Sequence, residues 1–143
     1  MRDLSNKPFY GVIKEYEHWV VLFREKQVTV GSVIIMSKQL KARGLGELPV
    51  EAWTQFGEVC RDVEAMITRV FGAEKFNYLA LMMVDPEVHF HVIPRYSKPV
   101  RFAGLEFIDA DWPKATQRVA LDIPEEIRRG IEHRLKEYWN TTV

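Results

Sequence analysis

Residues 87–95 read EVHFHVIPR, and this stretch is the strongest indication of the fold. From residue 87 to residue 92, polar and apolar side chains alternate. Because successive side chains of a β-strand point to opposite faces, this pattern predicts one apolar and one polar row. The apolar row is Val88, Phe90 and Val92, and the polar row is Glu87, His89 and His91. The apolar row supplies the core contacts, so the histidines are available for chemistry, although two histidines on a solvated sheet face would give the same pattern.

Further strands are predicted on either side of this one. Residues 76–84 form a nearly continuous apolar run typical of a central strand, and the Asp-Pro pair that follows favours a short turn into an antiparallel strand at 88–94. Upstream, residues 19–23 and 28–36 are rich in β-branched and aromatic residues and predict a hairpin. Gly31 lies inside its second strand, which indicates a bulge or a close approach by a ligand or another backbone.

Two helices are predicted from apolar spacing. After Pro49, apolar residues recur at alternating intervals of three and four, and Gly72 follows the last of them, so we expect a helix over residues 50–71. This stripe consists of Trp53, Phe56, Cys60, Val63, Ile67 and Val70. Residues 122–125 read DIPE, a typical helix start, and predict a C-terminal helix. In the segment between Arg95 and this C-terminal helix, only residues 105–108 suggest a further short strand.

Length and composition restrict the class of protein. The 143 residues contain 20 basic and 20 acidic side chains and no linker, so we expect a single domain over residues 1–143 that binds neither a nucleic-acid polymer nor an anionic membrane. Residues 1–14 lack the apolar run of a signal peptide, and no segment approaches the roughly 20 apolar residues that span a bilayer. Cys60 is the only cysteine, which excludes an internal disulfide. We therefore expect a soluble cytoplasmic protein.

Residues 88–95, VHFHVIPR, resemble the end of the signature of the histidine triad (HIT) superfamily, His-φ-His-φ-His-φ-φ, in which φ is apolar. Residues 29–35, TVGSVII, are similar to the family strand that follows a glycine, and the long helix and Asn77 also fall where the family has them. With the predicted elements, this resemblance implies an α+β fold: an antiparallel sheet of about five strands, one long central helix and a C-terminal helix. It also implies a homodimer joined through the sheet edge and the long helix.

The resemblance also implies a reaction. HIT enzymes cleave nucleoside phosphoanhydrides or phosphoramidates by attack of the middle histidine on the α-phosphorus, and that position is His89. A neutral imidazole with a pKa near 6.5 is a good nucleophile at neutral pH and can depart again. His91 takes the position that contacts the phosphate or the leaving group. The implied ligand is a small-molecule nucleotide, with no cofactor.

Three more residues are candidates for binding the substrate. Asn77 would hydrogen-bond to ribose or phosphate, and Ser32 would donate one hydrogen bond. Arg95 would neutralise phosphate, since a guanidinium matches its geometry. The alternatives are structural: a strand-end role for Asn77, and an exposed charge or an ion pair for Arg95.

Two departures from the family pattern leave other functions open. Glu87 replaces the first histidine of the triad, and Ser32 replaces the histidine after the upstream glycine. A carboxylate about 5 Å from a phosphate oxygen, at an effective dielectric near 20, is repelled by roughly 3 kcal/mol, or two orders of magnitude in binding or rate. One alternative is therefore a degenerate relative that binds a nucleotide or a protein without turnover. Another is a metal site, because the polar row offers oxygen and nitrogen ligands. Its members would be Glu87, His89 and His91, with Asp85 nearby and His18 or His133 as a distant ligand.

Overall fold

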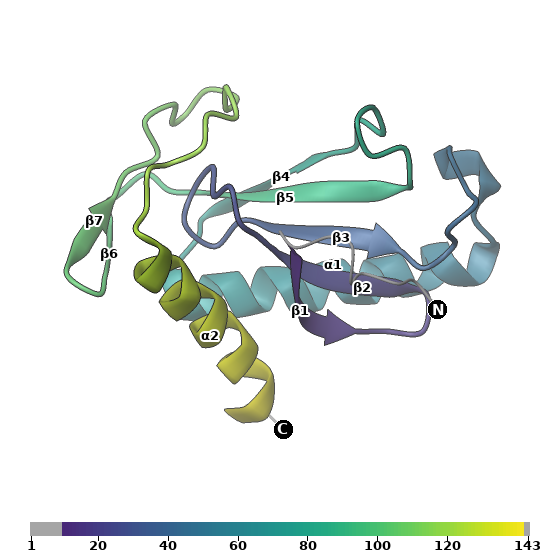
Figure 1. Cartoon of the computed structure of the whole chain (residues 1–143), viewed down its shortest axis with the longest axis horizontal. Helices are drawn as coiled ribbons and strands as arrows, with labels where there is room; N and C mark the ends of the chain where they lie inside the picture. Colours follow the sequence, from purple (N-terminus) through teal and green to yellow (C-terminus); the bar gives the residue numbers. More distant parts are fainter. Residues whose placement is uncertain (1–9, 142–143) are drawn as a thin grey trace.

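The computed structural model describes residues 10–141, and their backbone forms a five-stranded antiparallel sheet with strand order β1-β2-β3-β5-β4 (Figure 1). The strands are β1 (Tyr10–Glu15), β2 (Trp19–Arg24), β3 (Val33–Ser37), β4 (Lys75–Leu79) and β5 (His89–Arg95). The helices are α1 (Val50–Phe71) and α2 (Glu125–Thr141), with a short 3₁₀ turn at Leu45–Glu47. A separate two-stranded sheet pairs β6 (Val100–Phe102) with β7 (Leu105–Phe107). The predicted α+β architecture is confirmed.

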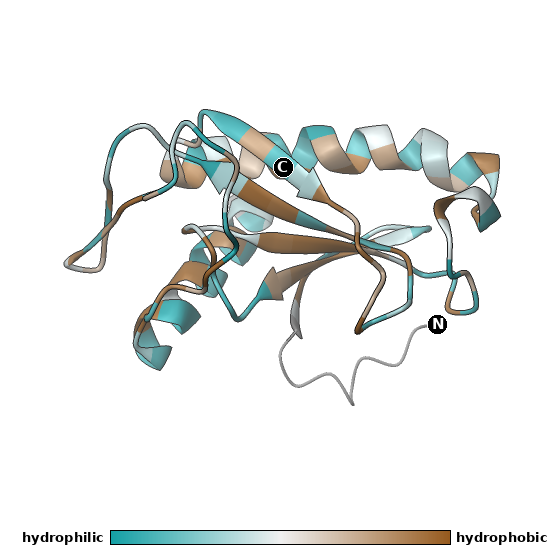
Figure 2. Ribbon diagram, turned by 90° about the horizontal axis from the view of Figure 1, so that it is seen from above, coloured by the Kyte–Doolittle hydropathy of each residue, from teal (hydrophilic) through white to brown (hydrophobic). Residues whose placement is uncertain are grey.

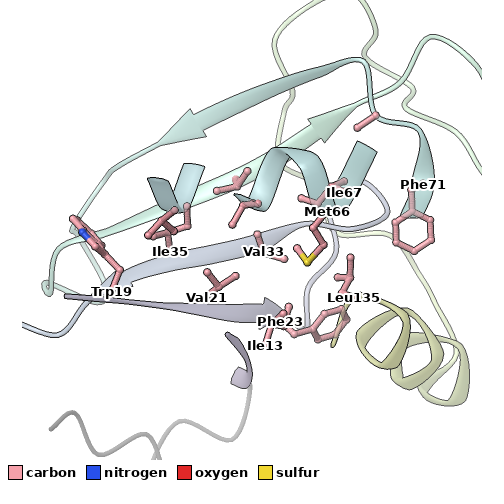
Figure 3. Close-up of a cluster of buried hydrophobic side chains, with 14 of the residues drawn as sticks. Ile13, Trp19, Val21, Phe23, Val33, Ile35, Met66, Ile67, Phe71 and Leu135 are labelled. Carbon is pink, nitrogen blue, oxygen red and sulfur yellow. The ribbon is translucent and has the colours of Figure 1, made fainter. Parts of the chain in front are cut away.

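The main core lies between one face of the sheet and both helices. Side chains from β2, β3 and β5 pack there against α1 and α2, and Figure 3 shows part of this cluster around Met66 and Leu135. Both helices carry hydrophilic and hydrophobic residues in alternation, whereas the central strands are mainly hydrophobic (Figure 2). A second, smaller buried cluster lies on the opposite face of the sheet. It consists of Val20, Leu22, Ile34 and Met36, each at most 2% exposed. Both faces of β2 and β3 are therefore buried, which explains their continuous apolar sequences.

Both predicted helices are confirmed. α1 spans residues 50–71 and ends at Gly72, which adopts the left-handed conformation (φ 76°) and donates its N–H to the Thr68 carbonyl at 2.8 Å. A left-handed residue after the last turn is a common helix stop. α2 begins at Glu125, one residue after Pro124, whose carbonyl accepts the N–H groups of Ile127 and Arg128.

The predicted strand at 28–36 is too long, because β3 begins only at Val33. The Gln27 side chain holds the preceding residues in a loop. Its Oε1 accepts the N–H of Gly31 at 2.7 Å and that of Ser32 at 3.1 Å, and its Nε2 donates to the Ser32 carbonyl at 2.7 Å. Gly31 has φ 91°, and a Cβ there would lie 3.1 Å from Phe71 and 3.3 Å from Ile67. The close approach predicted at this glycine exists, but side chains of α1 make it.

The strand predicted at 76–84 is too long, and it is an edge strand and not a central one. β4 ends at Leu79 and lies at the edge of the sheet, although it does pair antiparallel with β5 as expected. Residues 80–88 form a long connection in place of a short turn. Within it Met83 and Val84 are 78% and 97% exposed, so an apolar sequence here does not mark a buried strand. β1 was not predicted, and β7 agrees with the short strand expected near residues 105–108.

No helix within residues 10–141 is long and apolar enough to cross a membrane.

Candidate active site

His89 and His91 lie side by side on the face of β5 that points away from α1. Their ring centroids are 5.0 Å apart and the ring planes are nearly perpendicular, at 83°. Met36 on β3 is the register partner of His89, and His91 lies between Ile34 on β3 and Leu79 on β4. The apolar row packs toward α1 on the other face, as predicted. His89 is almost completely buried, at 4% exposure, and His91 is half-buried.

A backbone carbonyl orients the His89 ring. Nδ1 of His89 lies 2.7 Å from the carbonyl oxygen of Glu87, two residues earlier in the chain. Because a carbonyl oxygen only accepts hydrogen bonds, this contact assigns the proton of a neutral imidazole to Nδ1. Nε2 then carries the lone pair. This is the protonation state that a nucleophilic imidazole requires.

His91 is held in its neutral form. Burial, the positive charge of Arg24, its neighbour His89 and the charge of Arg118 lower its pKa to about 4, while Asp85 acts in the opposite direction. Burial disfavours the charged form of an imidazole, and nearby cations add to this effect. Nδ1 of His91 is buried and has no hydrogen-bond partner within residues 10–141. At neutral pH the ring therefore offers one N–H donor and one acceptor.

This lowered pKa predicts a dependence of stability on pH. Above pH 6.5 the ring is neutral in both the folded and the unfolded chain and has no effect. Between pH 6.5 and about 4 only the unfolded chain takes up the proton, so stability falls as the pH falls. For a half-buried ring partly screened by solvent, we expect a loss of about 1–2 kcal/mol. Urea unfolding across this range should show the loss in wild type and not in His91→Asn. His133→Asn, which changes an exposed histidine on α2, should follow wild type; parallel curves for all three proteins would contradict the prediction.

Glu87 contributes to the site through its backbone. It lies two residues before His89, the first residue of β5. Its carbonyl oxygen is the acceptor that orients the His89 ring. Its side chain is half-buried, with the carboxylate oxygen Oε2 shielded from solvent. Ser32 is fully buried at the end of the Gln27 loop, where its hydroxyl donates to the Thr29 carbonyl at 2.8 Å.

Arg95 forms an ion pair, which is one of the two structural roles considered for it. Its Nε and Nη2 donate to the Asp109 carboxylate at 2.6 and 3.1 Å, and its Nη1 donates to Oδ1 of Asn77 at 2.8 Å. The Tyr96 N–H adds a further hydrogen bond to Asp109 at 3.1 Å. Burial alone would raise the pKa of Asp109, but these donors outweigh it and hold the pKa below its usual range. The ion pair fastens the connection after β7 to the end of β5.

A cleft of about 650 Å³ opens between β4–β5 and residues 112–118, and its lining includes neither His89 nor His91. Asn77 and Leu79 of β4 and Ile93 of β5 line its floor, and Leu79 is also the register partner of His91. Trp112, Lys114 and Arg118 line the opposite wall, and Lys75 and Arg95 complete it. Asp109 and this wall were not predicted from the sequence, because residues 96–117 show no periodic pattern.

The structure does not support the metal interpretation. No group of three or more His, Cys, Asp or Glu side chains among the described residues could hold a metal ion. His133 lies on the exposed face of α2, where it faces Glu137 at 3.8 Å, and the backbone N–H of His18 donates to Gln55 near the start of α1. Neither joins His89 and His91.

Comparisons with known proteins agree with this architecture. No protein-family model and no curated protein matches the sequence. Among solved structures, a histidine triad protein from Marinobacter aquaeolei VT8 is 19% identical, with a TM-score of 0.72 over 100% of this chain and 98% of that one. A histidine triad protein from Sinorhizobium meliloti 1021 is 22% identical, with a TM-score of 0.70 over 96% of each chain. A hypothetical histidine triad nucleotide-binding protein from Sulfolobus tokodaii strain 7 is 15% identical, with a TM-score of 0.70 over 96% of this chain and 89% of that one. The chain therefore has a HIT-like fold.

Proposed function

We propose that this chain is a HIT superfamily protein that cleaves a nucleoside phosphoanhydride or phosphoramidate, acting as a nucleotide hydrolase or nucleotidyl transferase with His89 as the nucleophile. The observation that carries the proposal is the contact between Nδ1 of His89 and the Glu87 carbonyl. It leaves Nε2 unprotonated on a ring that is fixed in place. The likeness of the fold to a nucleotide-binding histidine triad protein supports the same conclusion.

In the proposed reaction, Nε2 of His89 attacks the α-phosphorus of the nucleotide. A P–N bond forms, the bond from phosphorus to the leaving group breaks, and the leaving atom keeps the electron pair. Water then attacks the same phosphorus and loses a proton. The P–N bond breaks with its electrons returning to Nε2, which releases the nucleoside monophosphate and regenerates the imidazole. Because the Glu87 carbonyl accepts a hydrogen bond from Nδ1–H throughout, it stabilises the positive charge on the ring in the intermediate.

We assign His91 and three further residues to substrate binding. A neutral His91 can donate one hydrogen bond to a phosphoryl oxygen without adding charge. Asn77 and Arg95 line the cleft beside it, and the Asn77 carbonyl oxygen is already used by Arg95, so its amide NH₂ is the donor left for a ligand. Ser32 would need to turn its hydroxyl away from the Thr29 carbonyl to reach a substrate. Substituting Ser32 with alanine and measuring KM tests that role.

The intermediate itself provides the test. Wild-type protein is incubated with a diadenosine polyphosphate or an adenosine phosphoramidate, quenched in alkali to preserve the phosphoramidate bond, and analysed by intact mass. We expect an AMP adduct, which peptide mapping places on His89. Absence of both an adduct and turnover with every such substrate, with wild type equal to His89→Ala, would refute the proposal.

A degenerate relative that binds a nucleotide or a protein without turnover is the second candidate, and Glu87 is the observation that favours it. It predicts stabilisation by nucleotides without product in wild type, and a gain of turnover in Glu87→His. Our proposal predicts the contrary, because the Glu87 backbone orients His89 whatever its side chain is. Glu87→His and Glu87→Gln should keep kcat within about tenfold of an active wild type, a change of at most about 1.4 kcal/mol in the barrier. Turnover that appears only in Glu87→His would establish the degenerate alternative.

We also propose a cytoplasmic homodimer joined through β4 and α1. β4 is an edge strand, and Phe76 and Tyr78 on it are half-buried beside the half-buried Phe56 and Cys60 of α1. An unpaired strand edge next to partly exposed aromatic side chains is suited to association. Sedimentation velocity should give the mass of two chains at micromolar concentration, and a monomer there would contradict the dimer.

A further inference from the structure

The charges beside β5 change sign along the strand. Asp85 and Glu87 precede His89 at one end. Beyond His91 at the other end lies the cleft, whose lining contains four basic side chains and no acidic one. These are Lys75, Arg95, Lys114 and Arg118. Because the whole chain has a net charge of zero, this concentration of positive charge is local to the cleft.

Three of these four cations are not neutralised by a neighbouring carboxylate. Arg95 is paired with Asp109, but Lys75, Lys114 and Arg118 form no ion pair with any described residue. Cations that share a cleft repel one another, and a bound anion relieves that repulsion. The three side chains are exposed, so their charges are accessible to an anionic ligand that enters the cleft.

The loop that carries two of these cations is held by its own hydrogen bonds. The Asp111 carbonyl accepts the Lys114 N–H at 2.7 Å, and the Asp111 carboxylate accepts the Gln117 N–H at 3.0 Å. The Arg118 N–H donates to the Thr116 hydroxyl at 2.9 Å. The loop begins at Asp109, which is paired with Arg95 on the cleft lining. The backbone of this wall is thus organised before a ligand arrives, which lowers the entropic penalty of binding.

The cleft lies next to the proposed reaction centre, because its lining residues Leu79 and Ile93 neighbour His91 on the sheet. Side chains two residues apart on a strand lie roughly 7 Å apart, so the floor residue Ile93 is one such step from His91 and two from His89. The positive charge of Arg118 also lowers the pKa of His91, so the two groups interact electrostatically. A substrate with its α-phosphorus at His89 would have its remaining phosphates attracted past His91 toward the cations of the cleft.

From this arrangement we infer that the cleft lined by Lys75, Lys114 and Arg118 binds an anionic leaving group, so that the preferred substrates are phosphoanhydrides and not phosphoramidates. This inference rests on the proposed function. When the P–O bond of a phosphoanhydride breaks, the bridging oxygen keeps the electron pair and the leaving phosphate gains one negative charge, which the three cations stabilise. The amine released from a phosphoramidate takes up a proton instead and leaves as a neutral amine or a cation, which gains nothing from them.

The test compares two substrates in two doubly substituted proteins. Lys114→Gln/Arg118→Gln removes two charges from the cleft, and Lys41→Gln/Arg134→Gln removes one lysine and one arginine charge from exposed positions elsewhere. We expect the cleft variant to lose about 10- to 100-fold in kcat/KM on a diadenosine polyphosphate, and less than about threefold on adenosine 5′-phosphoramidate. The control should match wild type on both. Equal losses on the two substrates, or no loss on the polyphosphate, would overturn the inference.

A binding measurement separates failure of this inference from failure of the proposed function. Calorimetry with inorganic tripolyphosphate should show binding to wild type that weakens at least about tenfold in Lys114→Gln/Arg118→Gln and not in the exposed-site control. Binding of this kind in a protein without turnover would refute the proposed function and leave the anion site in place. Turnover with undiminished tripolyphosphate binding in the cleft variant would retain the function and refute the site.

Discussion

Replacing His89 with alanine is expected to abolish turnover, with kcat lowered by about 10⁴-fold or more, because in the proposed reaction the bond to phosphorus forms at its Nε2. The ring is 4% exposed and fixed by the Glu87 carbonyl. His91 is the nearest imidazole, yet it lies one strand repeat away and its Nδ1 has no comparable acceptor among the described residues. Initial rates with a diadenosine polyphosphate, together with adduct formation by intact mass, measure the effect.

Two control variants test whether the loss of turnover comes from the loss of the nucleophile. His133→Ala removes an exposed imidazole from α2 and should leave the rate unchanged. His89→Gly opens space for added imidazole, which should restore part of the turnover and release the nucleotide as a small-molecule adduct. An unaltered rate in His89→Ala, with circular dichroism showing a folded protein, would remove His89 from the mechanism.

Local patterns predicted the elements whose apolar residues recur with a regular period. The apolar stripe before Gly72 gave both ends of α1, because a helix is satisfied within its own sequence. Alternation from residue 87 to residue 92 correctly predicted which face of β5 carries the histidines. The start of β3 could not be predicted in the same way. Residues 28–32 have strand composition, but the Gln27 side chain binds their backbone and holds them in a loop.

The candidate site was likewise predicted only where a local pattern marks its residues. The motif placed His89 and His91 correctly on one face, since residues two apart on a strand must share it. It could not show that a backbone carbonyl orients His89, because any residue at position 87 supplies that oxygen. The cleft joins Lys75 to residues 112–118, about forty residues later, and only the tertiary fold brings them together. No pattern in the sequence marks Asp109, although its ion pair with Arg95 joins the connection after β7 to the end of β5.

The second large effect is on stability, and it concerns Asp109. Replacing this residue with alanine should lower the free energy of unfolding by about 3–5 kcal/mol, because the Arg95 guanidinium would remain buried without its carboxylate. The two side chains are only 4% and 2% exposed, so water cannot easily replace the lost partner. Urea or thermal unfolding measures the change, and Glu58→Ala, at an exposed carboxylate on α1, serves as the control.

A double substitution decides whether the unpaired charge is the cause. If it is, Arg95→Met/Asp109→Leu should be more stable than Asp109→Ala, since an apolar pair of similar size leaves no buried charge. If instead Asp109 acts mainly by accepting the Tyr96 N–H, the double variant should be as unstable as the single one. A loss below about 1 kcal/mol in Asp109→Ala would show that the ion pair behaves like an exposed one. In that case the connection between β7 and α2, and with it the wall of the cleft, would be held mainly by its other contacts, among them the hydrogen bond from the Leu121 N–H to the Gln27 carbonyl at 2.7 Å.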